Sequence, residues 1–458
     1  MTEIHFQSIA NVGRVLRAGA LTSVELTQHL LDRIRAHTDV NAFVTITAEQ
    51  ALSDAKHADN AFAAGRDLGP LHGVPIAVKD LVDTHGVRTT YGSSFFEDHF
   101  PDRDAFVVKK LKEAGAVLLG KTGLHEFAYG MTGINDWYGP VRNPWHRDYI
   151  AGGSSSGSAA AVAAGLCFGA VGTDTGCSIR QPAHCCGIVG HKPTFGLVSK
   201  SGVFPLCQTM DHVGPMTRTV EDAALMLATM VGHDPSDPFS IPPRHTDGFL
   251  SAPLDVSTLT IGVIRAPFFE GRKDVVDRVD AALRSLSDAG ANLKLIDMPG
   301  LADIYKTCRL TFAEALAEHQ ERLDAAPEKF SREVRDKLIS AKAISGAAYA
   351  ASQQLRRELR LAFEALLASC DAIAAPTSTI GAVEIDNIPD DFWQLAARNT
   401  GFADFTGQPA ISVPCGVNDD GLPVGLMLTG RMHGDRALLQ TARTVEAALD
   451  CTMRPPGY

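Results

Sequence analysis

Hydrophobic positions in the first part of the chain alternate between two periods, which predicts helices and strands in turn. Residues 22–37 repeat apolar positions at helical spacing, and Thr22 stands three residues before Glu25, the pattern of a capping box. Residues 41–47 are typical of a short strand, and a second capped helix is predicted to begin at Thr47. This alternation favours a mixed or parallel sheet covered by helices.

Later segments continue the alternation. Residues 104–121 predict a helix and then a buried strand, with Gly115 at the end of the helix. Further strands, in one case preceded by a helix, are predicted within residues 259–267, 280–299, 371–378 and 409–417. Because large α/β enzymes often form one unit of this length, we predict a single α/β/α domain over residues 1–458, with a mixed, twisted central β-sheet covered by helices on both faces.

Local composition distinguishes three regions of this domain. Residues 73–193 are dense in Gly, Ser, Thr and short apolar runs, and we expect the chemistry to lie there. Residues 232–260 are rich in Pro, Asp and Ser, which indicates a surface connection or a subdomain seam. Residues 303–369 contain many Ala, Glu, Arg and Leu residues, and predict a long helical region.

Charge and hydropathy exclude several classes of partner. The formal net charge is −11 at pH 7, and no basic stripe occurs, so we expect no nucleic-acid partner. The first residues do not combine a basic region with an apolar run, and no apolar stretch is long enough to span a bilayer, so we expect no membrane partner. These observations predict a cytoplasmic protein.

The 9 cysteines form no recognisable framework. An odd, scattered set in a chain without an export signal predicts reduced and mostly buried thiols. His184, Cys185, Cys186 and His191 lie close together, but adjacent ligands without C-x-x-C spacing are poor chelators. We therefore expect no metal and no cofactor.

Residues 115–122 match a phosphate-binding pattern that their context argues against. The segment GAVLLGKT fits G-x-x-x-x-G-K-[ST], which functions as a loop between a strand and a helix. Here an amphipathic helix comes before Gly115, and the four variable residues are typical of a buried strand. We therefore do not expect Lys121 to bind a nucleotide.

Three segments have compositions that packing alone does not explain. GVPIAVKDLVD places Lys79 at the end of an apolar strand, and AGGSSSGSAAAVAAG places three serines at a helix start, where negative charge is stabilised. In GTDTGCSIR, small residues around Ser178 allow backbone N–H groups to converge on one point, as a tetrahedral oxyanion requires. A serine hydroxyl needs a base, and a desolvated lysine can supply one.

In this order the segments resemble the motifs of the amidase signature family, in which GVPxxVKD, GGSSGGS and GTDxGGSxR carry a Ser–cis-Ser–Lys triad. The resemblance extends through EFAYGMTGINDWYGPVRNP, DHVGPMTRTVEDAALML and TGQPAISVPCG, so it covers most of the chain. The matching catalytic residues are Lys79, Ser154 and Ser178, and the family spacing selects Ser154 over Ser155 as the bridge.

The resemblance also implies a mechanism and its supporting residues. Neutral Lys79 would take a proton from Ser154, which would take one from Ser178 as it attacks the acyl carbon. The implied oxyanion hole comprises Thr175, Gly176, Cys177 and Ser178, and the implied supporting residues are Gly153, Ser155, Asp174 and Arg180. Ser156 and Cys177 replace glycines of the common pattern; both are small, so we expect the triad to be retained.

Substrate recognition follows from the same resemblance. Family members line the acyl pocket from the segment before the serine loop and from the C-terminal half, which makes residues 303–369 a substrate-side region. The implied pocket residues are Phe127, Tyr129, Gly130, Met131, Trp137 and Phe402. We expect a small-molecule amide, anilide or carbamate (urethane) as substrate, with esters as further candidates and a homodimer as the candidate assembly. Aryl acylamidases and urethanases are the expected counterparts.

Alternatives remain open at this point. The chain could be the A-type subunit of a glutamyl-tRNA amidotransferase, which needs partner chains and feeds ammonia to a second site. It could also be a non-catalytic binding protein on the same fold. A nitrilase-type site with Cys, Glu and Lys is not favoured, because none of the cysteines stands in such a setting.

Overall fold

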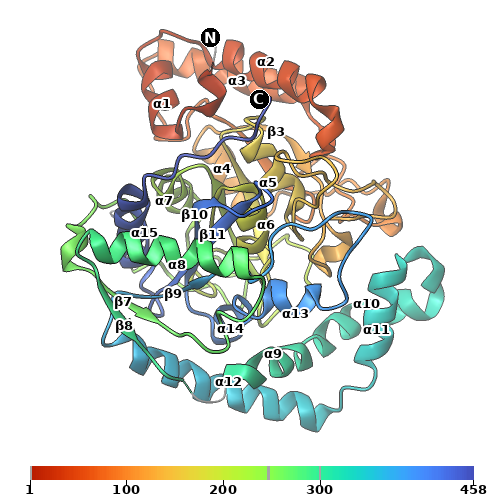
Figure 1. Ribbon diagram of the computed structural model, residues 1–458. Helices are drawn as coiled ribbons and strands as arrows, with labels where there is room; N and C mark the ends of the chain where they lie inside the picture. The colour runs from red at the N-terminus through yellow and green to blue at the C-terminus, as the bar shows by residue number, and fades with distance from the viewer. Residues whose placement is uncertain (1–2, 245–247, 299–300) are drawn as a thin grey trace.

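The computed structural model describes residues 3–244, 248–298 and 301–458. Residues 245–247 of the predicted connection and residue 299 of the predicted helix–strand segment lie outside the described residues. The N-terminal helices α1 to α3 lie at one end of the molecule, and the helices α9 to α12 lie at the opposite end (Figure 1).

A mixed sheet of 11 strands runs through the described residues, in the order β1-β3-β2-β4-β6-β5-β10-β11-β9-β7-β8. The strands are β1 (Phe43–Ile46), β2 (Pro75–Lys79), β3 (Val117–Thr122), β4 (Gly169–Asp174), β5 (Val189–Lys192), β6 (His212–Thr217), β7 (Thr260–Val263), β8 (Asn292–Leu295), β9 (Ala372–Pro376), β10 (Ala410–Val417) and β11 (Pro423–Thr429). β2 pairs in parallel with β3 and β4, and β7 pairs in parallel with β8 and β9, whereas the strands between these groups are antiparallel.

Helices flank this sheet. They are α1 (Ile9–Arg17), α2 (Ser23–Ala36), α3 (Ala48–Ala63), α4 (Phe106–Glu113), α5 (Ser156–Ala163), α6 (Arg180–Cys186), α7 (Val220–Met230), α8 (Lys273–Asp288), α9 (Leu301–Leu310), α10 (Ala313–Ala325), α11 (Arg332–Ala341), α12 (Gly346–Leu367), α13 (Phe392–Ala397), α14 (Gly401–Thr406) and α15 (Asp435–Leu449). α5 and α6 pack against each other and the middle strands, while α15 contacts α7, α8 and β10. The predicted α/β architecture with a mixed sheet is confirmed.

The helix α5 lies inside the protein. All of its residues are buried, which fits a sequence of small apolar and hydroxyl side chains without a polar face. At Gly157 an added Cβ would stand 2.4 Å from the backbone oxygen of Ala42 and 2.4 Å from the backbone nitrogen of Gly123. Glycine therefore allows α5 to approach the β3 region closely, and this fixes the loop that comes before the helix.

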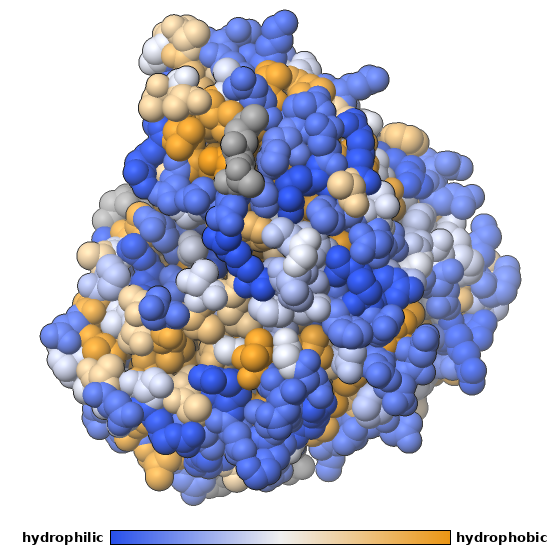
Figure 2. Space-filling view, turned by 45° about the horizontal axis from the view of Figure 1, so that its top comes forward, coloured by the Kyte–Doolittle hydropathy of each residue, from blue (hydrophilic) through white to orange (hydrophobic). Residues whose placement is uncertain are grey.

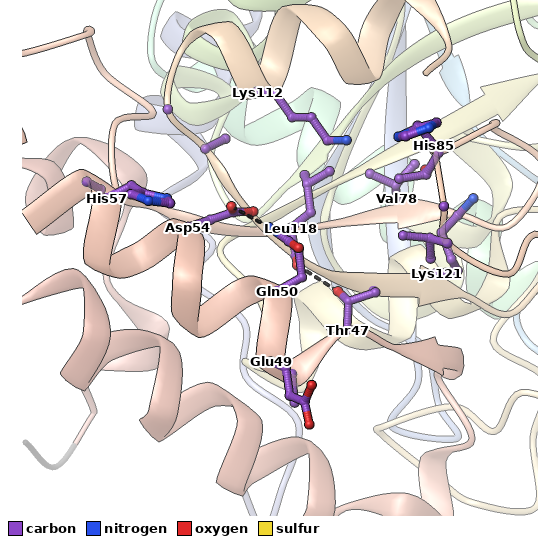
Figure 3. Close-up of a pocket in the computed structure, with 18 of the residues that line it drawn as sticks. Thr47, Glu49, Gln50, Asp54, His57, Val78, His85, Lys112, Leu118 and Lys121 are labelled. Carbon is purple, nitrogen blue, oxygen red and sulfur yellow. Dashed lines mark hydrogen bonds between the residues drawn. The ribbon is translucent and has the colours of Figure 1, made fainter. Parts of the chain in front are cut away.

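Most predicted elements are present, and one predicted cap is wrong. α2 begins with the capping box of Thr22 and Glu25. Thr47 does not cap α3, because its hydroxyl donates a hydrogen bond to the carbonyl oxygen of Leu118 at 2.9 Å (Figure 3). Thr47 thus joins α3 to the neighbouring strand β3. The predicted long helical region is divided into the four helices α9 to α12.

Hydrophilic side chains cover most of the face seen in Figure 2, and hydrophobic side chains are scattered among them in small groups.

No helix in the described ranges combines the length and the apolar character that crossing a bilayer requires. Residues 232–255 form neither helix nor strand where they are described.

Candidate active site

Lys79 is a buried lysine at the end of the fully buried strand β2. Its Nζ atom lies 2.7 Å from Ser154 Oγ and 2.7 Å from Thr173 Oγ1. Burial lowers the pKa of Lys79 to about 7, while the more distant carboxylates of Asp174 and Asp211 act in the opposite direction. Near neutral pH a substantial share of this amine is uncharged and can accept a proton.

Ser154 stands in the loop between Ala151 and α5, and the Gly153–Ser154 peptide bond is cis. The backbone N–H of Gly153 donates to Gln181 Oε1 at 2.8 Å, which ties this loop to α6. The backbone N–H of Ser155 donates to the carbonyl oxygen of Ser178 at 3.2 Å. The loop of the bridging serine therefore contacts the loop of the predicted nucleophile directly.

Ser155 also ties this loop to β4. Its hydroxyl donates to the carbonyl oxygen of Thr173 at 3.1 Å and accepts from the backbone N–H of the same residue at 3.1 Å. Thr173 in turn contacts Lys79 through its side chain. Ser155 thus aligns the serine loop with the strand that carries a partner of the lysine.

Ser178 lies in the turn between β4 and α6. The carboxylate of Asp174 accepts hydrogen bonds from the backbone N–H groups of Ile179 at 3.1 Å and Arg180 at 3.4 Å, and so shapes this turn. The backbone N–H groups of residues 176–178 have no acceptor among the described residues. An added Cβ on Gly176 would meet nothing within 4 Å, so the turn faces open space. Such N–H groups can stabilise an oxyanion.

A buried ion cluster fixes the base of the same turn. Arg180 Nε lies 2.9 Å from Asp174, and Arg180 Nη2 lies 2.5 Å from Asp404, with all three side chains fully buried. Burial acts to raise the pKa of Asp174, but the adjacent Arg180 holds it below its ordinary value. Asp174 and Arg180 therefore organise the turn, and neither lines the cavity described next.

A cavity of about 470 Å³ opens at Ser178, a volume within the usual range for ligand sites. The predicted residues that line it are Tyr129, Gly130, Met131, Thr175, Gly176, Cys177 and Ser178. Lys79 and Ser154 do not line it and have no exposed surface, whereas Ser178 is 5% exposed. Among the three predicted catalytic residues, only the predicted nucleophile can therefore meet a ligand.

Three predicted pocket residues lie elsewhere. Phe127 is fully buried in an aromatic cluster that includes Phe204 and Phe330. Phe402 is 1% exposed, and its ring stacks on those of Phe268 and Phe363. Trp137 is 40% exposed, and its indole N–H donates to Glu126.

These three side chains do not line the cavity. The position of a residue in a sequence motif does not determine the direction in which its ring packs. The other residues that line the cavity were not singled out from the sequence, although those from Cys308 to Ile344 lie in the region 303–369 that we expected on the substrate side. The residues not singled out are Ala128, Leu206, Met210, Cys308, Arg309, Leu310, Phe312, Lys337, Ser340, Ala341, Ile344, Trp393, Ala397 and Gly401. Many of them lie on the helices α9, α11, α13 and α14. In a sequence, apolar residues at helical spacing resemble ordinary core positions, and charged residues resemble a solvent-exposed helix face.

A second, larger cavity of about 1020 Å³ lies between α3, β3 and the loop at residues 84–87 (Figure 3). Part of the segment 115–122 lines it, but residues 117–122 form β3, as the sequence predicts. Lys121 is 1% exposed, and its Nζ donates to Val82 O and to Thr89 Oγ1 at 2.8 Å. The segment is thus a strand and does not form a phosphate-binding loop.

Comparison with known proteins gives full-length matches. A protein of Synechococcus sp. (strain CC9311), named as the A-type subunit of glutamyl-tRNA(Gln) amidotransferase, is 39% identical over 98% of each chain. A structure described as a vestigial protein complex that reveals the origins of an s-triazine catabolic enzyme has a TM-score of 0.90 at 32% identity, over 98% of this chain and 100% of that one. The peptide amidase of Stenotrophomonas maltophilia has a TM-score of 0.87 at 31% identity, over 99% and 98%.

These relatives correct one prediction. We expected a small-molecule substrate and at most a second copy of the chain as partners, with no nucleic acid. The Synechococcus relative is by name one chain of a multi-chain enzyme for a tRNA, and the s-triazine structure is described as a protein complex. The prediction of partners limited to a small molecule and a homodimer is therefore wrong. The net charge of the chain is a poor guide to its partners, because it averages over the whole surface and does not describe the charge of a local interface.

Two findings show the family. The family model described as Amidase matches residues 25–439, which is most of the chain. The relatives above match over nearly their entire lengths, and the fold agrees with the solved amidase structures. The chain thus belongs to the amidase signature family, a family of enzymes that act on carbon–nitrogen bonds.

Proposed function

We propose that the protein cleaves the carbon–nitrogen bond of an amide through an acyl-enzyme on Ser178, with Ser154 and Lys79 as the proton relay. The observation that carries this proposal is the 2.7 Å contact between Lys79 Nζ and Ser154 Oγ in a fully buried setting. A lysine with a pKa of about 7 can act as a base near neutral pH, because proton transfer is efficient when the pKa is close to the pH.

The proposed reaction has two halves. Ser178 Oγ bonds to the carbonyl carbon while its proton passes to Ser154 and the proton of Ser154 passes to Lys79. The backbone N–H groups of residues 175–178 stabilise the oxyanion, and each such donor is worth about 2.7–4 kcal/mol. The relay then returns a proton to the leaving nitrogen, so the amine departs neutral. Water attacks the acyl-enzyme by the same route and releases the acid.

Cys177 is the rival nucleophile, since it comes directly before Ser178 and lines the same cavity. Burial raises the pKa of the Cys177 thiol well above its ordinary value, with Asp174 adding to the effect. The thiolate is the nucleophilic form of cysteine, so this environment disfavours its attack. We therefore assign the attack to Ser178.

The test compares two neighbouring variants. Ser178→Ala should lose covalent labelling by a fluorophosphonate and lose activity by at least about 10⁴-fold. Cys177→Ala should retain both within about threefold, because its side chain is small and takes no part in the reaction. Labelling that persists in Ser178→Ala and disappears in Cys177→Ala would refute the assignment.

A second candidate is that this catalytic chain acts as the A-type subunit of an amidotransferase, and the full-length match to such subunits favours it. A stand-alone amidase should hydrolyse simple amides, anilides or carbamates as the purified chain. A chain that works within an amidotransferase should be labelled by the fluorophosphonate alone, yet release ammonia from glutamine at full rate only with its partner chains. Full hydrolysis by the isolated chain, unchanged by partners, would rule out the amidotransferase role.

A further inference from the structure

The charged residues that line the cavity at Ser178 are all cationic. They are Arg309, at the end of α9, and Lys337, on α11. No Asp or Glu occurs among the described residues that line this cavity. The rest of the lining is largely apolar and aromatic. A cavity whose uncompensated charge is positive favours ligands of negative charge.

Lys337 is held in a fixed position. Its Nζ donates to the carbonyl oxygen of Tyr129 at 2.9 Å and pairs with Glu333, which also lies 3.6 Å from His125 Nε2. The same ammonium lies 4.2 Å from the ring centroid of Trp393, a favourable cation–π distance. Glu333 thus compensates the charge of Lys337 from outside the cavity, and the ammonium is kept at the wall.

Arg309 differs from Lys337 because its charge is uncompensated. Arg309 is exposed, and its guanidinium has no hydrogen bond or ion pair with any other described residue. Burial raises the pKa of Tyr129 and lowers that of Lys337, and the positive charge of Arg309 acts to lower both. The two cations therefore lie within electrostatic range, and an anion between them would relieve their repulsion.

We propose that the amide cleaved at Ser178 carries a carboxylate, which Arg309 binds at the wall beside Lys337. This inference rests on the proposed function and names its substrate class. A guanidinium matches a carboxylate through two parallel N–H···O bonds, a geometry that an amide or hydroxyl group cannot reproduce. The chain between the carboxylate and the amide then lies against Tyr129 and Phe312, whose rings stack 5.3 Å apart.

The test uses two amides of similar size that differ in charge. Succinamate carries a carboxylate at the far end of its chain, whereas butyramide ends in a methyl group, and both release ammonia. The intact protein should have a kcat/KM for succinamate about 10- to 100-fold above that for butyramide, as expected for a charge-assisted contact. Arg309→Gln should remove most of this preference, chiefly by raising the KM for succinamate.

Two further variants sharpen the result. Arg309→Lys should keep part of the preference, because it retains the charge without the paired donors. Arg332→Gln removes an arginine that is 86% exposed on α11 and does not line the cavity, so the preference should persist. An equal preference in the intact protein and in Arg309→Gln, or none in the intact protein, overturns the inference.

Failure of the proposed function would look different. If neither amide is turned over and the fluorophosphonate does not label Ser178, the catalytic assignment fails. The charge inference is then tested by binding of succinate to the Ser178→Ala variant, measured by calorimetry. Binding that weakens about tenfold or more when Arg309→Gln is added supports the inference, and binding that is unaffected overturns it.

Discussion

Two buried lysines on neighbouring strands, Lys79 on β2 and Lys121 on β3, make a natural comparison. Both are almost without exposed surface, and burial lowers the pKa of both, to about 7 for Lys79 and about 8 for Lys121. Burial and a lowered pKa therefore do not separate a base from a structural cation. Lys192, at the end of β5, supports this point, because burial lowers its pKa to about 7 and it lines neither of the two cavities.

The two lysines differ in the groups that surround their Nζ atoms. Lys121 faces acceptors: Asp80 at 3.7 Å, the carbonyl oxygen of Val82, and Thr89, whose hydroxyl donates its own proton to Val87 O. These acceptors all need a hydrogen from Lys121, so they require the charged ammonium form of its side chain. Lys79 faces the hydroxyls of Ser154 and Thr173, which can donate as well as accept. A neutral amine is therefore tolerated at Lys79 and disfavoured at Lys121.

Replacing Lys79 gives the largest expected effect on activity. Lys79→Met should lower kcat/KM by about 10⁴-fold, because the relay loses its base. The thermal midpoint should fall little or rise, since a buried amine is replaced by an apolar chain of similar length. Full turnover by this variant would contradict the proposed relay.

Replacing Lys121 should lower the stability of the protein and leave its activity nearly unchanged, in contrast to replacing Lys79. Lys121→Met leaves the carboxylate of Asp80 buried without its cation, and breaking such a pair costs about 3–5 kcal/mol. Urea unfolding should report this loss, while kcat per folded molecule stays close to that of the intact protein. If kcat fell as far as in Lys79→Met, the distinction between the two lysines would be lost.

The pH dependence of kcat/KM should report the titration of Lys79. The proposed relay needs the neutral amine, so activity should be constant above a pH of about 7 and fall as the pH drops below it. Each further unit of pH should cost about tenfold, as for one proton. A profile that is flat through this region, or that rises toward acid pH, would exclude a lysine base with this pKa.

Smaller effects are expected from the hydroxyls around the two lysines. Thr173→Val removes one partner of Lys79 and should lower kcat/KM by about 5- to 30-fold, the value of one hydrogen bond to a charged or basic group. Thr89→Val is the matched change beside Lys121 and should lower stability with little change in kcat/KM. Equal effects of the two variants on kcat/KM would show that the hydroxyl beside Lys79 has no special role.

The sequence predicts the parts of the molecule that depend on local pattern. Strand and helix alternation, the turn at Gly115 and the buried end of β2 follow from periodicity and composition. Lys79 and Ser154 come from motifs far apart in the chain, and they meet because β2 and the serine loop both flank β4.

The features that the sequence does not predict depend on contacts between residues far apart in the chain. Arg309 and Lys337 lie on helical segments whose charged positions resemble a solvent-facing surface, and only the packing of these helices brings them to the cavity at Ser178. Thr47 fits a capping pattern, but β3 offers its hydroxyl a carbonyl oxygen instead. Tertiary contacts decide among the local options in each case.

The separation of the proposed catalytic residues from the charged residues of the cavity has an evolutionary consequence. The proposed catalytic residues stand on β2 and on the two turns that precede α5 and α6, where their neighbours are mostly buried, whereas the charged residues of the cavity stand on α9 and α11. Mutations at positions 309, 337 or 393 can exchange one amide for another while the bond-breaking apparatus stays intact. Laboratory selection for new amides should therefore accumulate changes at these positions and leave the sheet untouched.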